Sequence, residues 1–70
     1  MKGNEFLRKI KRYADRKELK YRWVASRGAG SHGTVYVGEH MTVVKDLKKE
    51  LGKGLFRSMC RDLEIDAREL

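Results

Sequence analysis

The sequence predicts a single α+β domain in which two helices pack on one face of a three-stranded antiparallel sheet. Apolar residues recur at helical spacing near both ends of the chain, which indicates an amphipathic helix at each end. Between them lie short β-prone runs separated by glycine-containing turns. A chain of 70 residues has room for one domain, which we take as residues 1–70.

The first helix is predicted to run from Asn4, a candidate N-cap, to about Lys17. Its apolar residues fall on one side of the helix and form a core stripe: Phe6, Leu7, Ile10, Tyr13 and Ala14. The opposite side is basic and carries Arg8, Lys9, Arg12 and Arg16. The pattern therefore predicts a helix that buries one face and presents positive charge on the other.

Residues 21–27, 31–37 and 41–44 are β-prone and predict three strands. The Gly-Ala-Gly segment at 28–30 breaks the first run. The aromatic residues of the first strand, Tyr21 and Trp23, have rings on which RNA bases can stack. In so small a domain we expect both rings to pack in the core instead.

The loop between the second and third strands decides which side chains share a face, because a shift of one residue turns a strand over. A three-residue loop at 38–40 places Val35, Val37, Met41 and Val43 on one apolar face and leaves His32, Thr34, Tyr36 and Thr42 on the other. A two-residue Gly38-Glu39 turn is also reasonable chemistry, but it mixes apolar and polar residues on both faces. We therefore predict the three-residue loop.

A charged connection at 45–53 leads into a second helix, predicted from about Gly54 to Leu63. Its apolar arc comprises Leu55, Phe56, Met59, Cys60 and Leu63, with Arg57 and Arg61 opposite. Residues 66–69 have the form of a capping box, which predicts a short third helical turn. The resulting order, α-β-β-β-α, resembles the double-stranded-RNA-binding domain, whose members read RNA by shape and backbone.

The charge is strongly positive and unevenly spread. The chain has 17 Lys and Arg against 10 Asp and Glu, a net charge of +7. Eight of these cations lie in residues 1–20 and six in residues 45–62. A field of this sign attracts polyanions, such as nucleic acid or an acidic protein or membrane surface.

Composition argues against several classes of protein. There is no apolar run of membrane-spanning length and no signal-peptide core, so we expect a cytoplasmic protein that does not engage a membrane. The lone cysteine, Cys60, excludes an internal disulfide, and no zinc-site spacing is present. A core this small without such staples predicts a stabilising protein partner.

His32 is the residue best suited to chemistry, because a histidine moves protons near neutral pH. The flanking glycines, Gly30 and Gly33, allow a phosphate to approach closely. In RNA the 2′-hydroxyl supplies the nucleophile, so a proton carrier and positive charge suffice. Ser31, Thr34 and Tyr36 lie nearby in the sequence and are candidate hydroxyl partners, although each of these residue types is more often a plain strand residue. A plain surface histidine beside a turn is the alternative interpretation for His32. His40 is expected to be a solvated turn residue.

Several segments together resemble the HicA toxins of bacterial toxin–antitoxin systems. They are Arg27, the Gly-Ser-His motif at 30–32, Lys-Asp-Leu-Lys-Lys-Glu-Leu at 45–51, Gly-Leu-Phe-Arg at 54–57 and the ending at 59–70. The resemblance covers nearly the whole chain. Gly-Ser-His alone is weak, but its occurrence with the segment at 45–51 is specific.

The resemblance implies a double-stranded-RNA-binding-domain-like fold and a type II toxin that acts in stress responses. It implies an endoribonuclease that cleaves mRNA, with His32 as the catalytic residue, and a HicB-like antitoxin that covers the active site. We expect cleavage without a metal or other cofactor, because the chain has no ligand cluster. We expect RNA to be held by Arg27, Ser31, Lys45, Lys48, Lys49, Arg57 and Arg61.

The chain departs from the family pattern at two places. Gly33 stands where many members carry a second histidine, and Val44-Lys45-Asp46 stands where many have Pro-x-His. No second proton-transfer group is therefore assigned. The rival interpretations are a non-catalytic RNA-binding module of the same fold and an adaptor for an acidic protein. The histidine motif separates the enzyme from both rivals, because neither rival needs a histidine there. Salt-dependent RNA binding separates the RNA-binding module from the adaptor.

Overall fold

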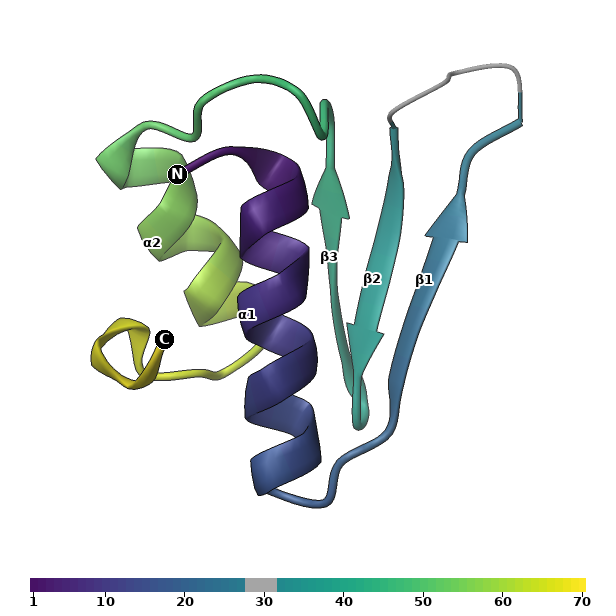
Figure 1. The fold of residues 1–70 in the computed structure, drawn as a ribbon, viewed down its shortest axis with the longest axis vertical. Coiled ribbons are helices and arrows are strands. Elements are labelled where there is room, and N and C mark those ends of the chain that lie inside the picture. The colour runs from purple at the N-terminus through teal and green to yellow at the C-terminus, as the bar shows by residue number, and fades with distance from the viewer. Residues whose placement is uncertain (28–31) are drawn as a thin grey trace.

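The computed structural model describes residues 1–27 and 32–70, which form two α-helices and a three-stranded antiparallel sheet (Figure 1). The elements are α1 (Gly3–Arg16), β1 (Tyr21–Ala25), β2 (Gly33–Val37), β3 (His40–Val44), α2 (Lys53–Asp62) and the 3₁₀ turn η1 (Ala67–Glu69). The strands lie in the order β1-β2-β3, and both helices lie on the same side of the sheet. The predicted order of elements is confirmed.

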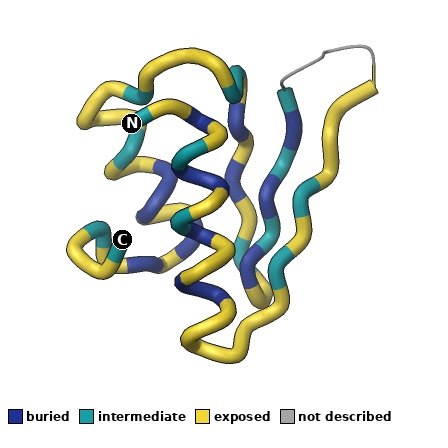
Figure 2. The backbone as a smooth tube through the Cα atoms, in the orientation of Figure 1, coloured by how far each residue is buried: buried dark blue, intermediate teal, exposed yellow. Residues whose placement is uncertain are grey.

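The hydrophobic core fills the space between the sheet and the helices. α1 packs against β1 and β2, and α2 packs against β3. Buried residues of both helices face buried residues of the strands (Figure 2). The largest fully buried side chains are Phe6, Ile10, Met59, Leu63, Val35, Val37 and Val44. The rings of Phe6 and Phe56 meet edge to face at 5.9 Å and tie α1 to α2.

The start of α1 differs from the prediction. Lys2, not Asn4, occupies the N-cap position. The Asn4 N–H lies inside the helix and donates to the carbonyl oxygen of Leu47 at 2.9 Å. A Cβ on Gly3 would lie 2.6 Å from the carbonyl oxygen of Asp46, so glycine permits this approach. Backbone groups of the loop after β3 therefore satisfy the N-terminal N–H groups that a cap side chain would otherwise bind.

The three-residue loop between β2 and β3 was a wrong prediction. Val37 pairs with His40 and Val35 pairs with Thr42, which leaves a two-residue turn at Gly38-Glu39. Gly38 has φ of +59°, whereas Glu39 is not among the residues with positive φ. That combination is typical of a type II′ turn, whose twist matches that of the paired strands.

The shorter turn changes which side chains face the helices. Thr42 is buried on the core side, and its hydroxyl donates to Asp62 Oδ2 at 2.9 Å. That bond satisfies a polar group that would be costly to bury unpaired. Met41 and Val43, predicted in the core, are instead 48% and 43% exposed. We call the side of the sheet away from the helices the outer face; by register it carries Arg22, Val24, Thr34, Tyr36, Met41 and Val43.

The C-terminal turn follows the prediction. The Asp66 side chain accepts a hydrogen bond from the Arg68 N–H at 2.9 Å and so caps η1. The Arg16 guanidinium donates to the carbonyl oxygen of Glu69 at 3.0 Å, which ties α1 to this turn. In the described parts of the chain, no helix combines the length and apolar character needed to cross a membrane.

Candidate active site and basic surfaces

His32 lies immediately before β2, at the end of the sheet opposite the Gly38-Glu39 turn. Its carbonyl oxygen accepts a hydrogen bond from the Ser26 N–H at 2.8 Å, which extends the β1–β2 pairing by one step. Strict alternation along β2 places His32 on the same face as Thr34 and Tyr36. The residue is half-buried and stands apart from the hydrophobic core. It can therefore meet a ligand without disturbing the packing.

The indole of Trp23 occupies the space beside Gly33, the residue that follows His32. A Cβ at position 33 would lie 2.7 Å from two ring carbons of Trp23 and 2.5 Å from the carbonyl oxygen of Val24. A side chain at 33 is therefore excluded while the indole keeps its place. Trp23 and Tyr21 both pack against the core, as predicted.

The basic residue nearest to His32 in the sheet pattern is Lys45. Gly33 pairs with Val44 at the end of β3, so His32 and Lys45 leave the sheet at the same end. The Lys45 side chain is exposed. Arg27, just after β1, is also exposed and belongs to this end, whereas Ser31 lies outside the described residues. The structure thus brings together His32, Lys45 and Arg27 at one end of the sheet.

Lys48 and Lys49 are exposed in the loop that joins β3 to α2. Asp46 Oδ1 accepts a hydrogen bond from the Lys48 N–H at 2.8 Å, and the carbonyl oxygen of Lys49 accepts from Gly3 at 3.3 Å. The loop lies at the same end of the molecule as the start of β2 (Figure 1). Both lysines therefore add positive charge at this end of the molecule, and the backbone of Lys49 is fixed against α1.

Arg57 and Arg61 are exposed on α2, on the helix side of the sheet. His32 follows the alternation of the outer face, so the sheet lies between it and these two arginines. The two arginines therefore form a separate basic surface.

α1 presents a further basic surface with Arg8, Lys11 and Arg12 exposed. Arg16 was grouped with them on the sequence pattern, but it has a structural role. Its guanidinium binds the carbonyl oxygen of Glu69 and lies 5.7 Å from the centre of the Tyr13 ring. A test of phosphate binding by α1 should therefore leave Arg16 in place.

We predict that replacing Arg8 and Arg12 together with glutamine weakens RNA binding and lowers its salt dependence. Each lost phosphate contact should reduce the slope of log K against log salt by about 0.7 on single-stranded RNA, because fewer counterions are released. The measurement is fluorescence anisotropy across a salt series. Arg68→Gln is the matched control, since Asp66 already pairs with that guanidinium at 2.9 Å. Unchanged slopes would mean that this face only aids solubility.

Other candidate chemistry is limited. Among residues 1–27 and 32–70, no three His, Cys, Asp or Glu side chains gather to hold a metal ion. Cys60 is buried, and burial together with the Asp66 charge raises the pKa of its thiol. A buried thiol with a raised pKa is a core residue and a poor nucleophile. His40 Nδ1 lies 3.4 Å from Glu64 Oε2 at the other end of the sheet from His32.

Sequence reasoning missed one cluster on the outer face. Arg22 and Tyr36 are paired residues of β1 and β2, and the guanidinium carbon lies 4.9 Å from the ring centre. Their contact depends on a register between strands that periodicity within each strand does not specify. The only signal in the sequence for this contact was an Arg in one predicted strand and a Tyr in the next.

Comparison of this chain with protein-family models, with curated proteins and with solved structures gave no match.

Proposed function

We propose that the chain is an endoribonuclease toxin of a type II toxin–antitoxin system, similar to HicA, with a double-stranded-RNA-binding-domain-like fold. The observation that carries the proposal is the placement of His32. It lies half-buried at one end of the sheet, with the exposed cations Lys45 and Arg27 at the same end. This arrangement supplies a proton carrier and positive charge for a phosphate.

The chemistry follows from RNA itself. The 2′-oxygen attacks the adjacent phosphorus, and the bond from phosphorus to the 5′-oxygen of the next nucleotide breaks. The proton leaves the 2′-hydroxyl and a proton reaches the departing 5′-oxygen, so the products are a 2′,3′-cyclic phosphate and a 5′-hydroxyl. His32 acts as general acid or base in this exchange. Lys45 and Arg27 stabilise the charge that develops on the phosphorane oxygens.

The partner in this proposal is a HicB-like antitoxin. The outer face exposes Val24, Met41 and Val43, each between 42% and 48%. Several exposed apolar side chains on one sheet face are typical of surfaces that another protein covers. Such a partner binds only the folded domain, and so also raises its apparent stability.

The experiment is incubation of the purified chain with a long RNA in excess chelator. We expect cleavage to persist, because the proposed route needs proton transfer and cationic side chains but no metal. Loss of cleavage in chelator that magnesium or manganese restores would contradict the mechanism. RNA that is bound but never cut would favour the alternative, a non-catalytic RNA-binding module.

A further inference from the structure

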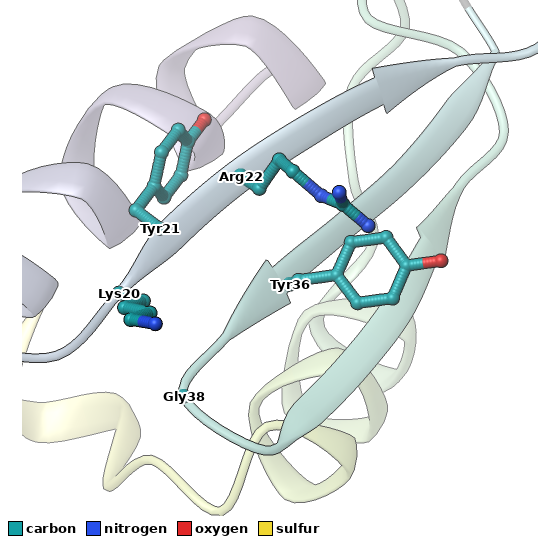
Figure 3. Close-up of a pocket in the computed structure, with 5 residues that line it drawn as sticks. All are labelled: Lys20, Tyr21, Arg22, Tyr36 and Gly38. Carbon is teal, nitrogen blue, oxygen red and sulfur yellow. The ribbon is translucent and has the colours of Figure 1, made fainter.

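The hairpin end of the outer face carries a second feature, remote from His32. Lys20, Tyr21, Arg22, Tyr36 and Gly38 line a pocket of about 430 Å³. Figure 3 shows the Arg22 and Tyr36 side chains projecting together from β1 and β2. The Tyr36 ring is half-buried, and the guanidinium carbon of Arg22 lies 4.9 Å from its centre. The guanidinium thus lies over the ring, and the two side chains form a stacked, partly exposed platform.

The lining of this pocket is cationic. Lys20 and Arg22 are both exposed, and none of the five described lining residues carries a carboxylate. A planar aromatic and guanidinium surface stacks well on a nucleobase, whereas an ammonium group binds a phosphate as a point charge. The pocket therefore has the two components that a nucleotide needs, in a chain whose net charge is +7.

The geometry points to a base-stacking subsite for single-stranded RNA, formed by Tyr36 and Arg22 with Lys20 on the adjoining phosphate. The subsite rests on the RNA-binding part of the proposed function and specifies its substrate. Bases inside a duplex have their faces covered, so stacking on a side chain requires an unpaired base. The element order alone suggests recognition of duplex shape, and the subsite adds a preference for unpaired RNA.

His32 immediately precedes β2, and strict alternation places it on the face that carries Tyr36. Tyr36 is four residues from His32 along β2, which corresponds to about 13 Å at the rise of an extended strand. A short unpaired segment that runs along β2 can therefore reach both positions. Stacking at Tyr36 would hold the RNA while a phosphate further along the segment reaches His32.

The test uses a uridine octamer with 2′-O-methyl groups, which cannot be cleaved by attack of the 2′-oxygen. We expect Tyr36→Val to raise its Kd about tenfold, because base–aromatic stacking contributes at this level. Tyr36→Phe keeps the ring and should bind within about twofold of the parent. Val43→Thr changes the same face away from the pocket and is the matched control. Parent-like binding by Tyr36→Val would overturn the subsite.

A second measurement needs no variant, so it decides the matter even if Tyr36→Val does not fold. An abasic octamer with the same 2′-O-methyl groups and phosphate charge should bind the parent chain about tenfold more weakly than the uridine octamer. Equal affinities would refute stacking and leave the outer face to a protein partner. Because neither octamer is cut, this binding result is independent of catalysis. If the chain cleaves long RNA but binds both octamers equally, the subsite alone is rejected. If the chain prefers the uridine octamer but does not cleave long RNA, the enzyme alone is rejected.

Discussion

Replacing His32 with alanine should slow RNA cleavage by about 10²–10⁴-fold, the range for loss of a general acid or base. Binding should change little, because many Lys and Arg contacts share the phosphate charge whereas proton transfer depends on one group. The measurement is the single-turnover cleavage rate alongside the Kd for an uncleavable RNA. Growth arrest on expression should disappear together with cleavage.

The structure indicates that the His32→Ala protein keeps its fold. His32 lies before β2, and the bond that fixes it there uses its backbone carbonyl oxygen, which alanine retains. It is not part of the hydrophobic core, so its loss should cost no more than about 1 kcal/mol of stability. His40→Ala is the matched control, because His40 begins β3 at the opposite end of the sheet. An active His32→Ala protein would favour the binding module.

Introducing glutamate at position 42 should unfold the domain, whereas glutamate at position 41 should be tolerated. Thr42 is 4% exposed and its hydroxyl binds Asp62, so a glutamate there would bury a charge beside a second carboxylate. An uncompensated buried charge costs about 3–5 kcal/mol, a large share of the stability of a small domain. Met41 is 48% exposed, and a surface change of this kind costs about 0.5 kcal/mol or less.

Urea unfolding followed by circular dichroism distinguishes the two variants. The pair is matched in chemistry and adjacent in sequence, so it isolates which face each residue occupies. A stable Thr42→Glu protein with a disrupted Met41→Glu protein would restore the three-residue loop and reverse the outer face.

The helices were predictable because the spacing of apolar residues within each segment is enough to specify a helix. The stripe from Phe6 to Ala14 repeats at helical spacing, and all five of its apolar members are buried. The second helix was predicted less well. Met59, Cys60 and Leu63 are buried, whereas Leu55 in its first turn is 45% exposed and borders a groove with Val43 and Lys45. The ends of short helices have few neighbours, so periodicity overstates their burial.

The hairpin shows where sequence reasoning failed. The prediction assumed that the face with more apolar residues must be the one that the helices cover. The observed register instead buries Thr42, which Asp62 satisfies, and exposes Met41 and Val43. The positive φ of Gly38 at the first position of a two-residue turn outweighs the sorting of side chains. Glycine followed by a polar residue was the signal for this turn.

The candidate site was predictable only in part. His32 and Lys45 emerge together because the antiparallel β2–β3 pairing returns the chain to the same end of the sheet. Arg57 and Arg61 were predicted to bind RNA as well, and the sequence did not show that α2 carries them on the side of the sheet away from the outer face. The Arg22–Tyr36 platform requires the register between β1 and β2, which is a non-local property. The sequence motif thus identified His32 as the candidate catalytic residue, and the tertiary structure showed which side chains lie around it.

The most direct test of the central claim is the chemical identity of the RNA ends. The parent chain and the His32→Ala variant would each be incubated with a long RNA in excess chelator, and the fragments analysed by mass spectrometry. Attack by the 2′-hydroxyl with His32 as proton carrier predicts 2′,3′-cyclic phosphate and 5′-hydroxyl ends that the variant forms about 10²–10⁴-fold more slowly. Fragments with 5′-phosphate and 3′-hydroxyl ends, or equal rates from both proteins, would contradict it.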